Sequence, residues 1–206
     1  MLTQWFDKTL MLTIRRELHG RAKMTMDHLR AEGIEAETFI GLDGEKTGLI
    51  TTHTYELDNP GTNYRIGPKT VNMQIGHWWI WKTFEYLQGD SFLLLEDDAR
   101  FVPGWKEHWN FARPQLPDDW DLLYVGSCCC MDRPRTQISG AIHKIEFALC
   151  THAYGVRRKA IPIILEACER VYAGIDISIA LHAIPKLNTY AFLPRLADQY
   201  KTEIAP

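Results

Sequence analysis

The chain has 206 residues, of which 46% are hydrophobic and 24% charged, and its formal net charge is −3. This length and composition are typical of a globular protein with one substantial core, so we expect a single domain over residues 1–206. A net negative charge provides no global positive field of the kind that attracts nucleic acid. We therefore expect no nucleic-acid partner.

Nothing in the sequence predicts a membrane span or secretion. No apolar run approaches the ~20 residues that cross a bilayer, and the first residues, MLTQWFDK, lack the layout of a signal peptide. The sequence does not exclude peripheral contact with a membrane surface. The five cysteines, three of them consecutive at 128–130, form neither a disulfide framework nor paired C-x-x-C spacing. We interpret them as reduced packing residues in a soluble, cytoplasmic protein.

The N-terminal part predicts a strand, a helix and a second strand. Residues 9–14 form a short apolar run, and residues 21–32 carry apolar side chains at helical spacing before a stop at Gly33. Residues 37–40 predict the second strand. A strand–helix–strand series of this length favours a parallel α/β sheet.

The middle of the chain predicts a loop, a helix and a buried strand. Residues 46–68 are rich in Gly, Thr, Asn and Pro without a clear period, which indicates a long loop. Residues 70–88 predict a helix that is apolar round most of its circumference and therefore largely buried. Residues 91–95 lack polar alternation, as expected of a strand covered on both faces.

The C-terminal half continues the alternation of strands and helices. We expect a strand at 121–126, a polar loop at 131–140, and a helix around 161–168 with Pro162 in its first turn. A shorter helix at 176–183 and a strand at 189–193 follow. The predicted fold class is α/β, a single three-layer domain with a mainly parallel central sheet.

Three adjacent carboxylates, Glu96-Asp97-Asp98, come directly after the predicted strand at 91–95. Because like charges repel, something must offset their repulsion. In open α/β sheets ligands bind beyond the carboxyl ends of strands, which is where this cluster falls. Carboxylates suit Mg²⁺ or Mn²⁺, which commonly bridge protein oxygens to phosphates. The alternative is a solvated turn in which Asp98 caps the next segment.

Other candidate residues are an isolated aspartate and three histidines. Asp176 lies at the start of a predicted helix and is either its N-cap or a general base that takes a proton from an attacking hydroxyl. A lone histidine is more often structural than a ligand, but His152 and His182 are better candidates than His77 for a metal or phosphate contact. No Walker-type or dinucleotide-type Gly-rich loop is present.

An ordered set of short motifs runs through the chain: Leu12-Thr13-Ile14-Arg15-Arg16 with Arg21, Asp43-Gly44, Gly76-His77 with Ile80-Trp81, Leu95-Glu96-Asp97-Asp98-Ala99, Tyr124-Val125-Gly126, Ala153-Tyr154-Gly155, Asp176, and Pro194 with Asp198-Gln199. In type and order the set resembles glycosyltransferase family 25, the lipooligosaccharide and collagen galactosyltransferase-like group, over roughly residues 9–200. The chain departs from that family's pattern at Gly76, where the family has Ser, and at Asn72, where it usually has Gly.

The resemblance implies a GT-A (Rossmann-like) fold and a metal-dependent, inverting transfer of a hexose, galactose or glucose, from a UDP-sugar to a hydroxyl of a glycan or glycoprotein, as in lipopolysaccharide biosynthesis. It implies Mn²⁺ or Mg²⁺ at Asp98 and Asp97, with Asp176 as the general base. His182 is the candidate for a further metal ligand. The expected donor-binding residues are Arg15, Arg16, Asp43, Gly44, His77, Glu96 and Asp97.

Two other classes of protein use similar residues. A metal-dependent phosphoesterase or nucleotidyltransferase would employ the same carboxylates, although it usually needs a second, separated set of acidic or histidine ligands. A non-catalytic module that binds a sugar nucleotide or a glycan would keep the site without turnover. Release of sugar and nucleoside diphosphate, rather than phosphate, would distinguish the transferase.

Overall fold

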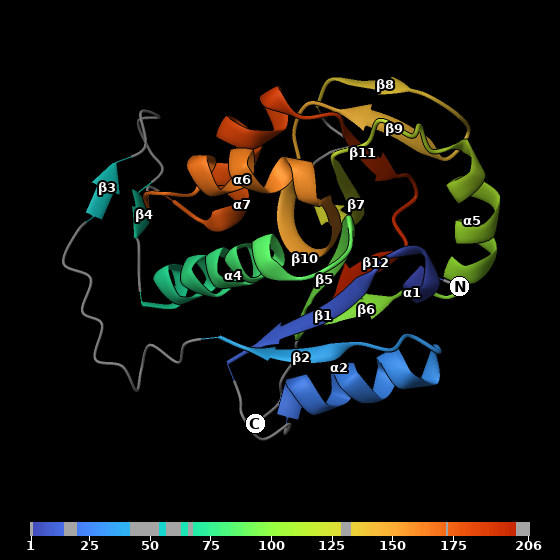
Figure 1. Cartoon of the computed structure of the whole chain (residues 1–206), viewed down its shortest axis with the longest axis horizontal. Helices are drawn as coiled ribbons and strands as arrows, with labels where there is room; N and C mark the ends of the chain where they lie inside the picture. The colour runs from blue at the N-terminus through green and yellow to red at the C-terminus, as the bar shows by residue number, and fades with distance from the viewer. Residues whose placement is uncertain are drawn as a thin grey trace.

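The computed structural model describes residues 2–14, 20–41, 54–56, 63–65, 68–128, 133–171 and 173–200. Within these residues an eight-stranded sheet has the order β2-β1-β5-β10-β7-β11-β9-β8 (Figure 1). Its strands are β1 Lys8–Thr13, β2 Glu37–Ile40, β5 Ser91–Glu96, β7 Leu122–Cys128, β8 Arg135–Gln137, β9 Ile142–Ile145, β10 Leu149–Arg157 and β11 Thr189–Phe192. Two small antiparallel pairs lie outside this sheet: β3 (Thr54–Glu56) with β4 (Asn63–Arg65), and β6 (Ala99–Phe101) with β12 (Ala197–Gln199).

Most strands of the large sheet point the same way. β1 pairs in parallel with β2 and β5, and β11 pairs in parallel with β7. β10 runs antiparallel between β5 and β7, and β9 runs antiparallel to both β11 and β8. Six of the eight described strands therefore share one direction, which confirms the predicted mainly parallel sheet.

Helices cover both faces of the sheet and make three layers (Figure 1). One face carries α4 (Pro68–Tyr86), α6 (Ile161–Ala167) and α7 (Ile175–Ser178), and the other carries α1 (Leu2–Trp5), α2 (Gly20–Ala31) and α5 (Trp105–Ala112). Short helical turns are η1 Arg113–Gln115, η2 Arg158–Ala160, η3 Ile179–Ala183 and η4 Ile184–Lys186. No helix in the described part of the chain is long and apolar enough to cross a bilayer.

Strand β5 shows how the sequence produces the two cores. Successive side chains of a strand point to opposite faces. Phe92 and Leu94 accordingly pack in the core under α4 and α6, whereas Leu93 and Leu95 pack in the core under α2 and α5. The absence of polar alternation in this strand therefore reflects burial on both faces, as predicted.

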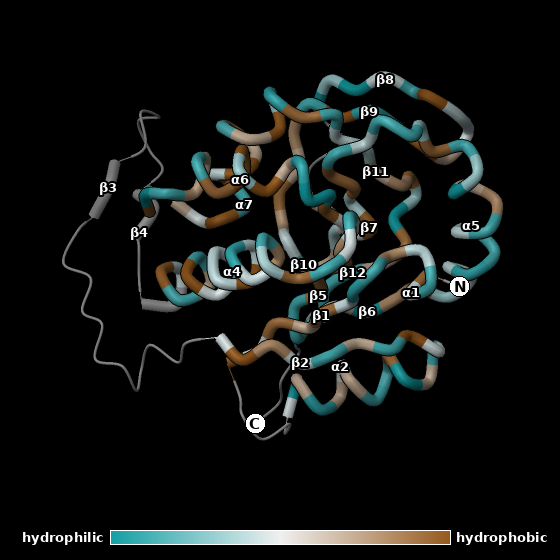
Figure 2. Tube along the Cα trace, viewed as in Figure 1, coloured by the Kyte–Doolittle hydropathy of each residue, from teal (hydrophilic) through white to brown (hydrophobic). Residues whose placement is uncertain are grey.

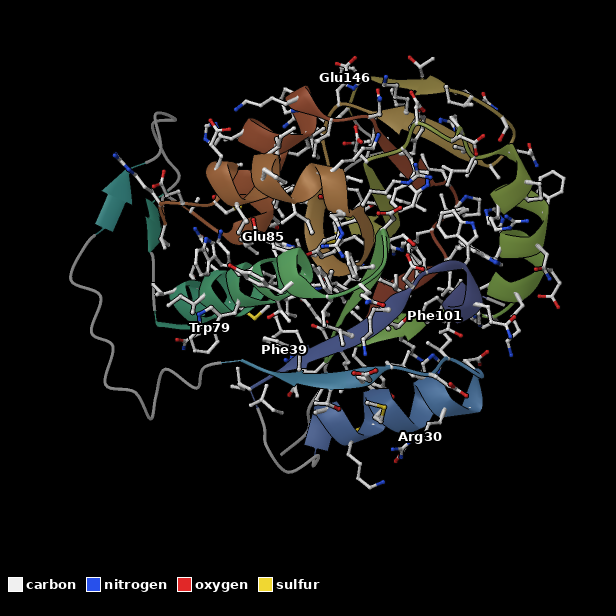
Figure 3. The ribbon with its side chains drawn as sticks, in the orientation of Figure 1. Arg30, Phe39, Trp79, Glu85, Phe101 and Glu146 are labelled. Atoms are coloured by element: carbon white, nitrogen blue, oxygen red, sulfur yellow. A yellow bond between two sulfur atoms is a disulfide. The ribbon has the colours of Figure 1, made fainter. Side chains whose placement is uncertain are left out.

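Helix α4 is less buried than its composition predicts. Its side chains at Ile80, Trp81 and Phe84 are fully buried, but Trp79 is 42% and Tyr86 is 86% exposed. Figure 3 labels Trp79 at the outer side of α4, and Figure 2 shows hydrophobic segments of this helix alternating with hydrophilic ones. Only one face of the helix meets the sheet, so the prediction of burial round most of the circumference is wrong for these two aromatic residues.

Several strands were not expected from the sequence. The central strand β10 was not predicted, and the predicted loops at 46–68 and 131–140 contain β3, β4 and β8. The predicted helix at 176–183 is instead a short α7 followed by the π-helical turn η3. Gly33, with φ +71°, follows the end of α2, and Pro162 lies in the first turn of α6, both as predicted.

Two of the cysteines are paired rather than reduced. Cys128 at the end of β7 and Cys150 in β10 form a disulfide, with their Cα atoms 5.6 Å apart. The pairing follows from the sheet, because β10 lies beside β7 and the partner of Cys128 in register is Leu149. The expectation of reduced cysteines is therefore wrong for this pair. Cys168 is free and buried, as expected of a packing residue, while Cys129 and Cys130 lie outside the described residues.

Candidate functional site

The acidic cluster lies at the carboxyl end of β5. Glu96 is the last residue of the strand, and Asp97 and Asp98 form the turn into β6. Glu96 is 8% and Asp97 is 9% exposed, and the Asp98 side chain is 15% exposed. The alternative reading of a solvated turn is therefore wrong. Three carboxylates buried this deeply need specific partners.

Asp97 is held by residues from β1 and α2. Its Oδ1 accepts hydrogen bonds from Nε (3.0 Å) and Nη2 (2.6 Å) of Arg21, and its Oδ2 accepts one from the hydroxyl of Thr13 (2.7 Å). The Thr25 hydroxyl donates to the Asp97 carbonyl oxygen (2.7 Å). With both carboxylate oxygens bonded, Asp97 is better suited to fixing Arg21 and the turn than to binding a cation.

Glu96 ends a chain of buried hydrogen bonds that begins in α4. The indole of Trp81 donates to the Tyr154 hydroxyl (3.0 Å), which lies 2.9 Å from Nδ1 of His77, and Nε2 of His77 lies 3.0 Å from Glu96 Oε1. Because indole is only a donor and a carboxylate only an acceptor, Tyr154 donates to His77 and His77 donates to Glu96. The hydroxyl of Thr151 adds a bond of 2.5 Å to the same oxygen.

These bonds decide the protonation of Glu96. Burial by itself raises the pKa of a carboxyl group, because it disfavours the charged form. The hydrogen bonds from His77 and Thr151 outweigh burial and lower the pKa of Glu96 below its ordinary value. Glu96 is therefore an ionised group whose Oε1 ties β5 to α4 and β10.

Asp98 has far fewer partners. Its Oδ1 is buried and has no hydrogen-bond partner among the described residues. Its Oδ2 lies 3.8 Å from Nη1 of Arg21, beyond hydrogen-bonding distance. Burial and the negative charge of Glu96 raise the pKa of Asp98 to about 6, although Arg21 acts in the opposite direction. A buried carboxylate with an unused oxygen needs an additional positive or donor group.

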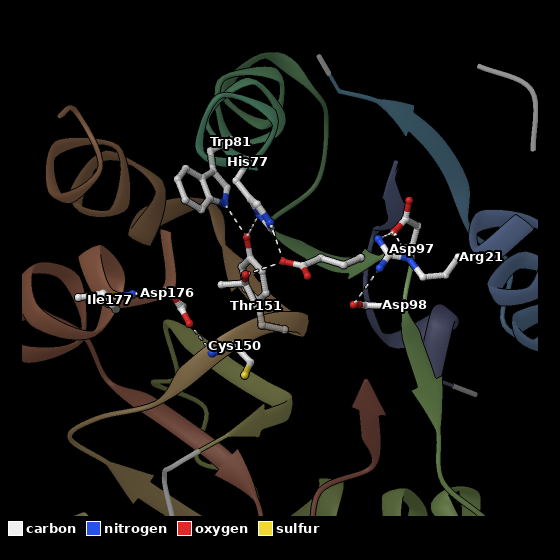
Figure 4. A network of polar contacts seen from close by, with 11 residues as sticks. Arg21, His77, Trp81, Asp97, Asp98, Cys150, Thr151, Asp176 and Ile177 are labelled. Atoms are coloured by element: carbon white, nitrogen blue, oxygen red, sulfur yellow. Dashed lines mark hydrogen bonds and ion pairs between the residues drawn. The ribbon is translucent and has the colours of Figure 1, made fainter. Parts of the chain in front are cut away.

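Asp176 lies on the other side of the Glu96 network. Figure 4 shows Asp176 and Asp98 apart, with His77 and Thr151 between them. The N-cap of α7 is Gly174, so the alternative that Asp176 caps its helix is wrong. Its Oδ2 accepts a hydrogen bond from the Cys150 N–H (3.0 Å), and its Oδ1 accepts one from the Ile177 N–H (2.9 Å). Two backbone donors thus hold a half-buried carboxylate in one orientation.

The other expected site residues fall in different places. His77 uses both ring nitrogens inside the Glu96 network, so its geometry favours support over direct contact with a donor. His182 is exposed on η3. Within the described part of the chain, Asp97, Asp98 and His182 do not form a cluster of closely spaced ligand atoms. Four expected donor-binding residues lie outside the described residues: Arg15, Arg16, Asp43 and Gly44.

A divalent cation fits Asp98 better than the other candidates. Mg²⁺ and Mn²⁺ prefer carboxylate oxygens, and one or two protein carboxylates together with substrate phosphates are a sufficient ligand set. The unpartnered Oδ1 of Asp98 offers such an oxygen, whereas Asp97 is occupied by Arg21 and Thr13. The metal-ligand role of Asp97 and His182 stays a prediction.

Sequence reasoning missed the groups that support the acids. Thr13, Arg21 and Thr151 come from three different elements. Thr13 and Arg21 stood in the first motif without a role of their own, and Thr151 stood in none. One signal was available for a second cluster: Cys150 and His152 are two apart, the spacing that places side chains on one face of a strand. Their ligand atoms lie within 4.8 Å of each other and of Cys128.

Known proteins resemble the chain in sequence, although no protein-family model matches it. It is 26% identical over 146 residues to a "Glycosyltransferase 25 family member" of Anopheles gambiae, covering 66% of this chain and 24% of that protein. It is 29% identical over 133 residues to a protein of the same name in Drosophila melanogaster, covering 58% and 21%. Procollagen galactosyltransferase 2 of Homo sapiens is 26% identical over 132 residues, covering 59% and 21%.

A solved glycosyltransferase involved in the glycosylation of the major capsid of PBCV-1 has a TM-score of 0.49 and 11% identity, covering 89% of this chain and 80% of that chain. The three curated sequence relatives are much longer than the matched stretch, which spans about a quarter or less of their length. These three sequence relatives are, by name, glycosyltransferases. More narrowly, the chain is similar in sequence to proteins of glycosyltransferase family 25.

Proposed function

We propose that the chain transfers a hexose, galactose or glucose, from a UDP-sugar to a hydroxyl group of a glycan or glycoprotein acceptor. The observation that carries the proposal is Asp98, a buried carboxylate with an unpartnered oxygen at the carboxyl end of a central strand. Its setting suits a cation that also binds a diphosphate. The proposal draws further support from the similarity to family 25 proteins.

Each acid then has a distinct task. Asp98 holds Mn²⁺ or Mg²⁺, which when bound offsets the charge that develops on the departing nucleoside diphosphate. Asp97 keeps Arg21 in place beside Asp98, and Glu96 keeps β5, α4 and β10 together. Asp176 accepts the proton of the acceptor hydroxyl as that oxygen attacks the sugar, in an inverting single displacement.

The general base is tested by Asp176→Asn. Asparagine can accept the bonds from Cys150 and Ile177 but cannot take a proton, so the fold should persist while kcat for sugar transfer falls about 10²–10⁴-fold. Released UDP is measured with UDP-galactose and UDP-glucose, Mn²⁺ and a panel of glycan acceptors. An unchanged kcat would remove Asp176 from the mechanism.

The same assay separates the alternative functions. A metal-dependent phosphoesterase would release phosphate from the donor, and a nucleotidyltransferase would make or cleave a nucleoside monophosphate linkage. A binding module would gain thermal stability with UDP and Mn²⁺ but release no product, because a ligand that binds the native state stabilises it. Only release of UDP together with sugar transfer supports the proposed function.

A further inference from the structure

A second cluster of metal-binding side chains lies beside the acidic site, on β7 and β10. The sulfur atoms of Cys128 and Cys150 and a ring nitrogen of His152 all lie within 4.8 Å of one another. His152 is completely buried, and the two cysteines are half-buried. The disulfide accounts for the two sulfur atoms, but it does not account for the histidine.

His152 is arranged as a metal-binding histidine. Its Nε2 lies 3.3 Å from the carbonyl oxygen of Ala197, which only accepts hydrogen bonds, so Nε2 carries the proton. Its Nδ1 is then an unprotonated acceptor, and it is buried without a partner among the described residues. Histidines that bind metals commonly donate their second ring nitrogen to a backbone carbonyl in this way.

A glycine on the neighbouring strand makes room for this arrangement. A Cβ atom at Gly126 would collide with Nε2 of His152 and would lie 2.5 Å from the carbonyl oxygen of Ala197. The strand therefore lacks a side chain at the point where the ring meets its carbonyl partner. Any larger residue at position 126 would push the ring away from Ala197.

We propose that Cys128, Cys150 and His152, in the form with two free thiols, bind a zinc ion at a site separate from the cation at Asp98. Two thiolates and a neutral imidazole are ligands that Zn²⁺ prefers, whereas Mg²⁺ and Mn²⁺ prefer carboxylate oxygens. The chemistry of the ligands therefore assigns different metals to the two neighbouring sites. Three protein ligands leave the fourth tetrahedral position to a water molecule.

The disulfide and the zinc site are alternative states of the same sulfur atoms. A phosphine reductant supplies two electrons to the S–S bond, which breaks. One water molecule gives its oxygen to the phosphine, which becomes a phosphine oxide, and its two protons to the two sulfurs. Zinc then displaces the thiol protons. With bonds of about 2.3 Å to each sulfur, a tetrahedral zinc ion holds the sulfurs about 3.8 Å apart.

The zinc site has a consequence for the acidic site. The two proposed zinc ligands on β10, Cys150 and His152, flank Thr151, whose hydroxyl donates to Glu96. The N–H of Cys150 donates to Asp176. A bound zinc ion therefore anchors the part of β10 that contacts both Glu96 and Asp176. Oxidation to the disulfide also ties this part of β10 to β7, but it leaves Nδ1 of His152 without a ligand.

The test is the zinc content of the whole chain after reduction. Protein is treated with a phosphine, which competes weakly for zinc, incubated with Zn²⁺, passed over a chelating resin and analysed by mass spectrometry. We expect one zinc ion per chain in the reduced protein and none in the oxidised protein. Cobalt in place of zinc should give thiolate-to-metal charge-transfer absorption and the intense visible bands of tetrahedral coordination.

Matched variants assign the ligands. Cys128→Ser and His152→Gln should each lose the bound zinc, and the glutamine amide can still donate to the Ala197 carbonyl. Cys168→Ala, which changes the free buried cysteine, should keep it. Asp98→Asn should also keep zinc, so this test does not depend on sugar transfer. A reduced chain without zinc or a cobalt–thiolate spectrum, or equal zinc in Cys128→Ser, overturns the proposal.

Discussion

The carboxylates of Glu96 and Asp98 lie on either side of Asp97, and their surroundings differ in every respect. Glu96 accepts bonds from His77 and Thr151, and these partners lower its pKa although the side chain is buried. Asp98 keeps an unpartnered oxygen, and burial raises its pKa to about 6. The protein thus uses one acid to hold its own elements together and leaves the other in need of a ligand.

This contrast links stability to function within three residues. A fully bonded carboxylate contributes to the free energy of folding, whereas an unpartnered buried carboxylate reduces it. Natural proteins commonly retain such unfavourable groups where a ligand binds. Replacing the two acids should therefore change stability in opposite directions.

The largest expected effect is on catalysis at Asp98. Asp98→Asn removes the proposed cation ligand, and the loss of several kcal/mol of charge stabilisation corresponds to a fall in kcat/KM of about 10³-fold or more. The variant should also lose the thermal stabilisation that UDP with Mn²⁺ gives the parent chain. Asp118→Asn, at an exposed site, is the control and should change neither quantity. Normal transfer by Asp98→Asn would show that the two acids do not differ in function.

The next largest effect is a gain: without metal, Asp98→Asn should raise the stability of the fold, whereas it lowers activity. The folded pKa of Asp98, about 6, is above the ordinary value of 3.8, so the native state binds its proton more tightly than the unfolded chain does. The native state therefore loses stability as the pH rises from about 4 to about 6, by up to about 3 kcal/mol. Asp98→Asn should gain that amount at pH 7.5, and the gain should vanish below about pH 4. Urea unfolding in the presence of a chelator, at pH 7.5 and below pH 4, measures the free energy of unfolding of the variant and of the parent chain.

Replacing the carboxylate of Glu96 by the corresponding amide should instead destabilise the fold. Glu96→Gln replaces charge-assisted bonds with neutral ones, which costs about 2 kcal/mol at neutral pH. Because the folded pKa of Glu96 is lowered, its contribution is present above the unfolded pKa and is lost as the pH falls through the folded pKa. Glu107→Gln, on the exposed surface of α5, is the control. A Glu96→Gln chain as stable as the parent would contradict the supporting role of this network.

The smallest expected effect isolates one bond of that network. Thr151→Val keeps the shape of the side chain but removes the donor to Glu96, and should cost about 1 kcal/mol in the free energy of unfolding. Thr151→Ser retains the hydroxyl and should recover most of the loss. Equal stability of the valine and serine variants would show that the bond contributes nothing.

Much of the fold could be predicted because the apolar strands have a strong signal. The strands at residues 8–13, 91–96 and 122–128 are buried on both faces and read as continuous apolar runs. β10 could not be read in this way, because it carries Cys150, Thr151 and His152. Its polar side chains are tolerated in the sheet because their partners come from elsewhere, as Glu96 does for Thr151.

The position of the acidic site could also be predicted, but not the division of roles within it. The residues by themselves place three like charges after a strand and give no reason to rank them. The assignment of the metal to Asp98 and Asp97 rests on the family resemblance alone. The ranking depends on Arg21 and Thr13, which lie 76 and 84 residues from Asp97 in the chain. Only the folded sheet and α2 bring the hydrogen bonds of these donors to Asp97, while Asp98 is left with Arg21 at 3.8 Å and no hydrogen bond from either.

The place of β10 in the sheet affects how the chain folds. β10 lies between β5 and β7, so it joins the two halves of the sheet, yet it follows both strands in the chain. During synthesis β5 and β7 must wait with unpaired edges until residue 157 has been made. Such distant pairing slows folding and exposes strand edges to aggregation. A chain that stops before Leu149 would retain the three acids but lack the strand that closes the sheet around them.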